Sequence, residues 1–267
     1  MAIIQSVLEH GAGQVVASAV ICTAVASFLL WHWREKSRIV PISVNYHFTR
    51  KCNKVCKFCF HTEKTSYVAI DADMKKGLKL LKDAGMRKIN FAGGEPFLYP
   101  QKLAMLCKYC SEVLKLESVS IISNGTLINH DWLERNARYI DVLGVSCDSF
   151  DEKTNDAIGR GAGDNVEKLF RVRQWCAALG IKFKLNTVVC ALNWQEDMVD
   201  RIAELAPFRW KCFQVSIVGD ENDASQEETR HDKRKRDARQ LYISDQQFQQ
   251  FCDVHGTSIV LCLSQIL

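Results

Sequence analysis

The chain has 267 residues, a formal net charge of +4 and 47% hydrophobic residues. This length and composition predict a globular chain of one large or two small domains, and exclude a disordered or fibrous one. The mild charge gives no indication of a nucleic-acid partner, so none is expected. Only three of the twelve cysteines cluster. This distribution indicates a reducing compartment and argues against a disulfide framework. We expect the three clustered cysteines to be ligands and most of the others to be small buried hydrophobic residues.

The first 38 residues have the composition of a membrane-associated helix. Residues 11–33 include no Asp, Glu, Lys or Arg, and basic residues follow directly after them. Such a stretch is long enough to span a bilayer or to lie along its surface. A first core helix of the domain is the alternative. Trp31 and Trp33 stand where an interfacial belt would be, and the trailing basic residues favour a cytosolic location for the rest of the chain.

Strand and helix patterns alternate through the rest of the sequence. Strands are predicted at 38–48, 88–92, 118–123, 140–148, 181–189 and 210–218. Helices are predicted at 71–85, 101–114, 131–139, 165–180 and 195–206. The first of these helices ends on Gly85, and Asp131 is the expected N-cap of the third.

This alternation predicts βα units and a parallel sheet. Six units fall short of a closed eight-stranded barrel, so the predicted fold is α/β, a partial (β/α)6 barrel. Chemistry in such folds lies at the carboxyl ends of the strands. The cysteines and the sequences GGEP, SNG, SCDS and LNTV all lie at or just past predicted strand ends. We divide the chain into an N-terminal segment 1–38, a core domain 39–251 and a divergent tail 252–267.

Three cysteines, Cys52, Cys56 and Cys59, follow the first predicted strand with the spacing C-x3-C-x2-C. A structural zinc site needs four ligands, and His61 is the candidate for the fourth. An iron–sulfur cluster normally takes four cysteines, so three of them on a [4Fe–4S] cluster would leave one iron open to a small molecule. Cys107 and Cys110 form a further C-x2-C pair, which we interpret as the core face of a helix.

Polar and glycine residues follow the later predicted strands. Gly93 and Gly94 would let a ligand approach the backbone closely, and Glu95 would accept a hydrogen bond from an ammonium group. The hydroxyls of Ser123 and Ser146 and the amide of Asn124 could hold ribose and carboxylate groups. Arg160 could pair with a carboxylate or phosphate. The alternative interpretation is that the glycines, serines and Asn124 only form turns, and that Arg160 is a surface arginine.

The cysteine spacing, with the aromatic Phe58 before the last cysteine, resembles the signature of the radical S-adenosylmethionine (SAM) superfamily. The resemblance implies that the three cysteines hold a [4Fe–4S] cluster whose open iron chelates SAM. An electron from the cluster then generates a 5′-deoxyadenosyl radical that abstracts a substrate hydrogen. The partial (β/α)6 barrel is also the fold of that family. The implied cofactor contacts are Phe58, Gly93, Gly94, Glu95, Pro96, Ser123, Asn124, Ser146, Arg160 and Asn186.

Over about residues 39–251 the sequence is similar to the viperin family of antiviral radical SAM enzymes. Segments such as SVNYHFTRKCNKVCKFCFHTEKTS and SVSIISNGTLI carry this similarity. It implies dehydration of CTP to 3′-deoxy-3′,4′-didehydro-CTP, a chain terminator for viral polymerases. It also implies a surface-lying amphipathic N-terminal helix on the cytosolic face of the endoplasmic reticulum and on lipid droplets. The implied substrate contacts are Asn45, Lys88, Lys184 and Lys211, which would otherwise be interpreted as ordinary strand residues.

The resemblance stops after about Asp253. Family members continue beyond this point with a part that completes the nucleotide pocket and ends in a tryptophan used by the cytosolic iron–sulfur loading machinery. We therefore expect a C-terminally truncated form of the fold, in which substrate closure and cluster delivery are in question. Two alternatives remain. One is a catalytically impaired, membrane-associated isoform that acts through protein contacts, and the other is a radical SAM enzyme with another substrate.

Overall fold

A computed structural model describes residues 40–225, 236–256 and 261–263, together with Val25, Ser27 and Phe28. The chain divides into two compact units, Met1–Val40 and Pro41–Leu267. In the first unit, Val25, Ser27 and Phe28 are helical and exposed. The predicted membrane-associated segment otherwise lies outside the described residues. Among the residues that are described, no helix is long and apolar enough to cross a bilayer.

The second unit alternates strands with helices. The strands are β1 (Ser43–His47), β2 (Lys88–Ala92), β3 (Ser118–Ser123), β4 (Val142–Ser146), β5 (Lys182–Val189), β6 (Arg209–Gln214) and β7 (Leu261–Leu263). The helices are α2 (Asp71–Asp83), α3 (Pro100–Lys108), α4 (His130–Asn136), α5 (Glu152–Ile158), α6 (Asn165–Ala178), α7 (Val199–Leu205) and α8 (Asp245–His255). Short 3-10 or π turns lie at Pro96–Leu98, Tyr109–Val113, Ala137–Tyr139 and Arg239–Leu241.

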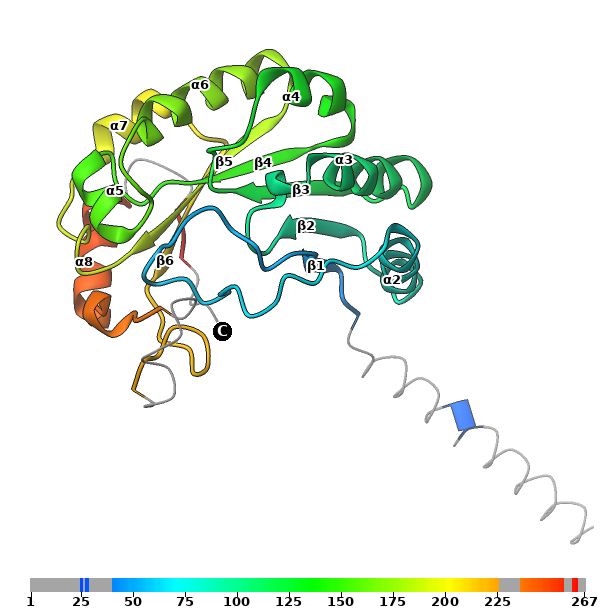
Figure 1. Cartoon of the computed structure of the whole chain (residues 1–267), viewed down its shortest axis with the longest axis horizontal. Helices are drawn as coiled ribbons and strands as arrows, with labels where there is room; N and C mark the ends of the chain where they lie inside the picture. The colour runs from blue at the N-terminus through cyan, green and yellow to red at the C-terminus, as the bar shows by residue number, and fades with distance from the viewer. Residues whose placement is uncertain (1–24, 26, 29–39, 226–235, 257–260, 264–267) are drawn as a thin grey trace, which may run out of the picture. The chain divides into compact units, whose positions relative to one another are not determined.

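All neighbouring strands in the sheet are parallel, in the order β1-β2-β3-β4-β5-β6-β7. The predicted partial barrel is confirmed, because the first six strands form an open, curved sheet (Figure 1). The last strand, β7, extends it beyond the six predicted strands. It lies in the stretch that the sequence analysis set apart as a divergent tail, and α8 precedes it.

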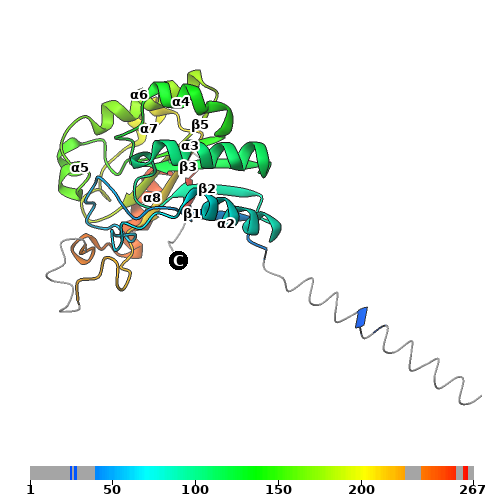
Figure 2. The ribbon, with the colours of Figure 1, turned by 45° about the vertical axis from the view of Figure 1, so that its right-hand side comes forward.

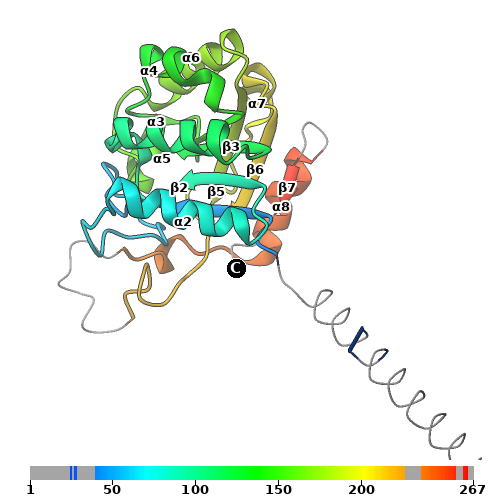
Figure 3. The same ribbon diagram turned by 90° about the vertical axis from the view of Figure 1, so that its right-hand side faces the viewer.

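The helices pack on the outer face of the curved sheet. Figure 2 shows α3, α4 and α6 side by side on that face, and Figure 3 shows α8 beside β6 and β7. Strand side chains alternate between the two faces. Phe91, Ile121 and Leu185 therefore point toward the helices, and all three are fully buried. Burying each such side chain contributes roughly 1.5–3 kcal/mol, so this face holds the core.

Besides shifts in the bounds of elements, the local structure differs from the predictions at three places. The N-cap of α4 is Asn129 rather than Asp131, since the Asn129 side chain accepts a hydrogen bond from the Trp132 amide at 2.9 Å. The helix α5 was not predicted at all. The predicted helix 101–114 ends as a π turn at Tyr109–Val113. The interpretation of Cys107 and Cys110 as core residues is confirmed, because both are fully buried.

Candidate active site

A cavity of about 520 Å³ lies on the face of the sheet that the helices leave free. Its walls are alternate residues of the strands and, facing them, the loop 48–70 between β1 and α2, which we call the cysteine loop. Its volume falls in the usual range of about 300–1,000 Å³ for ligand sites. The predicted site residues that line it are Asn45, Cys52, Cys56, Phe58, Cys59, Gly93, Gly94, Ser123, Asn124, Ser146, Arg160, Lys184, Asn186 and Lys211.

Three predicted site residues do not line this cavity. Glu95 and Pro96 are buried next to it in the GGEP turn. Lys88 is the exposed first residue of β2, two positions before the cavity-lining Asn90. Because side chains alternate along a strand, Lys88 lies on the same face as Asn90. The structure thus places Lys88 on the inner face, but at the far end of the strand from the cysteine loop.

The three cysteines of the cysteine loop all face the cavity. The Lys54 amide donates a hydrogen bond to the Cys52 sulfur at 3.4 Å, and the Cys59 thiol donates to the His61 carbonyl at 3.5 Å. Burial raises the pKa of all three thiols, that of Cys56 to about 11. Without a metal the thiols therefore stay protonated, and ligation would have to displace their protons.

The arrangement of the three cysteines is relevant to the kind of metal centre that the loop could hold. No three His, Cys, Asp or Glu side chains in the described part of the chain are arranged around one metal ion. His61 instead lies against His47, with their Nδ1 atoms 3.3 Å apart. An iron–sulfur cluster spreads its cysteine ligands over several irons, so its ligands need not surround a single point.

The glycines at the strand ends are required by the backbone of the cysteine loop. A Cβ atom on Gly94 would lie 1.9 Å from the Lys51 carbonyl oxygen, and one on Gly93 would lie 2.5 Å from that of Thr49. Gly159, after α5, approaches the Val55 carbonyl oxygen in the same way, at 2.5 Å. The prediction gave Gly93 and Gly94 the role of admitting a ligand. In the structure their missing side chains admit the cysteine loop.

Glu95 links the GGEP turn to the end of β3. One carboxylate oxygen accepts hydrogen bonds from the Phe97 amide at 3.0 Å and the Ser123 hydroxyl at 2.8 Å. The other accepts from the Asn124 amide at 2.7 Å. Burial nevertheless raises the pKa of Glu95 above its ordinary value. The carboxylate is therefore committed to protein donors, which use three of its roughly four lone-pair positions.

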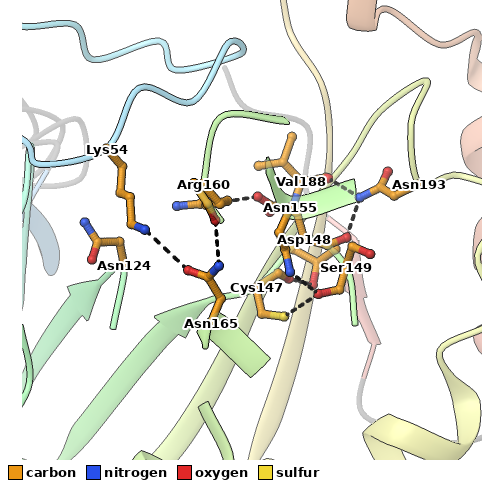
Figure 4. Close-up of polar contacts among 12 residues, drawn as sticks. Lys54, Asn124, Cys147, Asp148, Ser149, Asn155, Arg160, Asn165, Val188 and Asn193 are labelled. Atoms are coloured by element: carbon orange, nitrogen blue, oxygen red, sulfur yellow. Dashed lines mark hydrogen bonds and ion pairs between the residues drawn. The ribbon is translucent and has the colours of Figure 1, made fainter. Parts of the chain in front are cut away.

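A buried ion pair supports another part of the cavity wall. Arg160 donates to an Asp148 carboxylate oxygen at 2.7 Å (Figure 4), and its guanidinium lies 5.8 Å from the centre of the Phe58 ring. The other Asp148 oxygen accepts from the Val188 amide at 2.9 Å. The Asn193 side chain donates to the carbonyls of both Asp148 and Val188. Arg160 is thus a fixed cation at the cavity and not a surface residue.

Strand register brings the polar residues of the inner face into rows. Ser146, Asn186 and Lys211 pair across β4, β5 and β6. Lys184 lies two positions before Asn186 on the same face. At the other edge Asn90 donates to the Asn45 side chain at 2.9 Å. In the described chain, the buried polar side-chain atoms without a hydrogen-bond partner are His61 Nε2, Asn90 Oδ1 and Asn186 Oδ1.

Those three atoms belong to residues that line the cavity. Buried polar atoms without partners are costly, so they indicate a site made for a polar ligand. A cavity with three thiols and such atoms suits an iron–sulfur cluster with a polar cofactor and substrate.

Sequence reasoning missed several residues of this site. Asn90 carries a signal in retrospect, since it is a polar residue inside the otherwise apolar strand sequence INFA. His47, at the end of β1, is a polar residue close before the cysteines, and the sequence analysis considered His61 only as a zinc ligand. Asp148 lies in the sequence SCDS at a predicted strand end, but it is not among the predicted site residues. No local sequence pattern predicts the contacts of Glu221 and Asn222 with the cysteine loop.

Comparison with known proteins identifies the class of this site. The family model described as the Radical SAM superfamily matches residues 46–206. SuiB of Streptococcus suis bound to S-adenosylmethionine has a similar fold, with a TM-score of 0.64, 19% identity and coverage of 85% of this chain and 51% of that one. The structure of native anSMEcpe with bound AdoMet and Kp18Cys peptide gives a TM-score of 0.61 at 16% identity, over 82% of this chain and 63% of that one. The chain is a radical SAM protein.

Relatives similar in sequence narrow this class to a family. The S-adenosylmethionine-dependent nucleotide dehydratase RSAD2 of Oncorhynchus mykiss is 43% identical, over 95% of this chain and 71% of its own length. The protein of the same name in Danio rerio is 48% identical, over 84% and 61%. An archaeal nucleotide dehydratase, from Thermoplasmatales archaeon (strain ISO4-H5), is 38% identical over 68% and 64%. The chain belongs to the family of S-adenosylmethionine-dependent nucleotide dehydratases and spans 61–71% of the length of these relatives.

Proposed function

We propose that this chain converts CTP to 3′-deoxy-3′,4′-didehydro-CTP by radical SAM chemistry. The observation that carries the proposal is the composition of the cavity. Three cysteines of one loop and the lysines Lys184 and Lys211 line the same space. The family of nucleotide dehydratases supplies the reaction class. The thiols suit the cluster, and the lysines suit a polyanionic nucleotide.

The residues that would hold a [4Fe–4S] cluster are Cys52, Cys56 and Cys59. Those that would hold SAM are the backbone at Gly93 and Gly94 with the side chains of Ser146 and Asn186, along the strand ends. When bound, these groups supply a radical that abstracts hydrogen from the substrate ribose. Phe58 and Phe213, which also line the cavity, add apolar surface to it.

The inner face of the sheet orients the nucleotide. Lys182 and Arg209 each lie two positions before a cavity lysine on the same strand, so they share its face. With Lys88, the inner face is basic toward the start of the strands, away from the cysteines. We expect a triphosphate to lie toward these cations and the ribose to lie nearer the cysteine loop. Loss of the 3′ hydroxyl as water then consumes one proton and one electron from an external donor.

The direct test is anaerobic reconstitution of the chain with iron and sulfide, followed by dithionite, SAM and CTP. We expect 5′-deoxyadenosine and the didehydro nucleotide by mass spectrometry, and neither in the triple Cys52→Ala, Cys56→Ala, Cys59→Ala variant. Absence of cluster absorbance would refute the cofactor assignment. A cluster without CTP-stimulated SAM cleavage would refute the substrate. The same triple variant retaining full antiviral effect in cells would favour a role through protein contacts.

We also propose that the N-terminal segment holds the protein on the cytosolic face of the endoplasmic reticulum and on lipid droplets, in antiviral defence. The charge-free stretch 11–33 and the basic residues after it support this. A chain starting at Pro41 should lose membrane association in cell fractionation. It should keep cluster uptake, because every predicted site residue lies in the second unit. Unchanged association with membranes would contradict the assignment.

A further inference from the structure

The segment 216–222, directly after β6, contacts the cysteine loop from far away in the sequence. Glu221 lies 159 positions after Thr62, yet one of its oxygens accepts hydrogen bonds from the Thr62 amide at 2.9 Å and the Thr62 hydroxyl at 2.7 Å. The other oxygen accepts from Arg50 at 3.0 Å and lies 3.2 Å from the Lys64 ammonium. One carboxylate thus joins three residues of the cysteine loop.

Asn222 makes the neighbouring contact with the middle of the same loop. Its side chain is fully buried, and its amide nitrogen donates to the Phe58 carbonyl at 2.8 Å and to the Ser216 carbonyl at 3.0 Å. Its side-chain oxygen accepts from the Val218 amide at 2.7 Å. Phe58 stands between the second and third cysteines of the spacing, so this bond fixes the backbone within the ligand set.

These contacts reach both ends and the middle of the three-cysteine spacing. Arg50 precedes Cys52 by two residues, and Thr62 follows Cys59 by three. We propose that Glu221 and Asn222 are positioning residues, which hold the three thiols at the separations that an iron–sulfur cluster requires. The inference rests on the proposed function for the identity of that cluster. It adds a determinant outside the cysteine, GGEP and SNG sequences.

The loop depends on such contacts because it has little regular structure of its own. Ordering each backbone residue costs conformational entropy, which long-range hydrogen bonds must offset. The Glu221 side chain is only 12% exposed. Hydrogen bonds between a carboxylate and charged or backbone donors are the stronger kind. Other anchors come from the GGEP turn, at the Thr49 and Lys51 carbonyls. Loss of the Glu221 and Asn222 contacts should therefore loosen the loop while the sheet stays folded.

The test uses two nearly isosteric variants of the full chain. Asn222→Asp keeps the acceptor for Val218 but sets a carboxylate against the carbonyls of Phe58 and Ser216. Glu221→Gln keeps one acceptor oxygen and removes the charge that Arg50 and Lys64 face. The matched control is Glu117→Gln, which breaks the exposed ion pair with Arg87 on another part of the sheet. Because Glu221 is less buried than the fully buried Asn222, its variant stays informative if Asn222→Asp fails to fold.

The first measurement is iodoacetamide labelling of the cluster-free chains, resolved by mass spectrometry for each cysteine. Local opening controls such labelling. We expect Cys52, Cys56 and Cys59 to react about tenfold faster in both variants, since each loses bonds that hold the loop. Labelling of the buried Cys107 should not change, and Glu117→Gln should match the parent. The proposal would be overturned if all three cysteines were labelled in both variants at the same rates as in the parent chain.

The second measurement is made on reconstituted protein under anaerobic conditions. We expect the variants to lose iron to a chelator several-fold faster than the parent and to show a broadened electron paramagnetic resonance signal after reduction. A parent chain that takes up no cluster would contradict the proposed function, while the labelling result would still decide the positioning role. A parent with a stable cluster, matched by both variants in iron loss and signal, would overturn the positioning role alone.

Discussion

Gly94 makes the tightest approach between the GGEP turn and the cysteine loop. A methyl group there would overlap the Lys51 carbonyl oxygen, which is backbone and cannot rotate away. We expect Gly94→Ala to displace the cysteine loop, with a cost of about 1–3 kcal/mol and little iron bound after reconstitution. Urea unfolding and iron analysis check this.

The control for this substitution is Gly77→Ala. Gly77 lies inside α2, and its added Cβ would meet nothing within 4 Å. Alanine is the better helix former, so this variant should gain about 0.5–1 kcal/mol of stability and bind iron as the parent does. Equal iron contents in the two glycine variants would contradict the packing explanation.

Lys211 tests the assignment of the basic inner face to phosphate groups. It lies in register with Asn186, and its ammonium is 4.7 Å from the centre of the Phe213 ring. We expect Lys211→Ala to raise KM for CTP about tenfold and KM for CMP much less, because only the triphosphate reaches the strand lysines. Steady-state kinetics with CTP, CDP and CMP measures this.

The matched cation control is Lys79→Ala, on the exposed surface of α2, where Lys79 pairs with Asp83. This variant should keep the parent's ranking of the three nucleotides. A uniform rise of KM for all three nucleotides in Lys211→Ala would argue against a phosphate contact.

At the scale of single elements, the alternation of strands and helices could be predicted because apolar residues follow the two periods closely. The sequence SVSIIS was assigned to its strand with the correct bounds. α5 was missed because its seven residues, EKTNDAI, carry too few apolar positions for a period. The site was predictable where residues follow a strand end. The role of Gly94 was not, because its neighbour Lys51 is distant in sequence and only the fold brings the two together.

The helix α8 carries a buried histidine that makes its packing sensitive to pH. His255 is 1% exposed, and its Nε2 accepts a hydrogen bond from the Met198 amide at 3.0 Å. Burial lowers the pKa of His255 below its ordinary value of 6.5, although the Phe251 carbonyl and Asp197 oppose this. As the pH falls, the unfolded chain therefore binds a proton at His255 more readily than the folded chain does. Stability should fall as the pH drops below about 6.5.

Urea unfolding at several pH values compares the parent with His255→Gln, whose amide can still accept from Met198. Between pH 6.5 and 5.5 the parent should lose up to about 1 kcal/mol more stability than the variant, as expected for one proton. Parallel pH dependences of the two chains would show that His255 does not titrate in this way.

For the whole molecule, the parallel sheet explains why residues from distant segments share one cavity. Every strand enters from the same side, so each strand end delivers its loop to the same edge. The cysteine loop follows β1, and the GGEP and SNG sequences follow β2 and β3. The segment 216–222, which follows β6, forms hydrogen bonds with the cysteine loop. The central claim is therefore that a nucleotide on the inner face meets the chemistry of the cysteine loop.

Transfer of deuterium from labelled substrate tests that claim most directly. The reconstituted chain would be given SAM, dithionite and CTP deuterated at the ribose 4′ position, and the 5′-deoxyadenosine would be analysed by mass spectrometry. The account predicts one deuterium in the 5′-deoxyadenosine from this substrate, and none when CTP carries the label on the cytosine ring. Unlabelled 5′-deoxyadenosine, formed at the same rate with and without CTP, would contradict it.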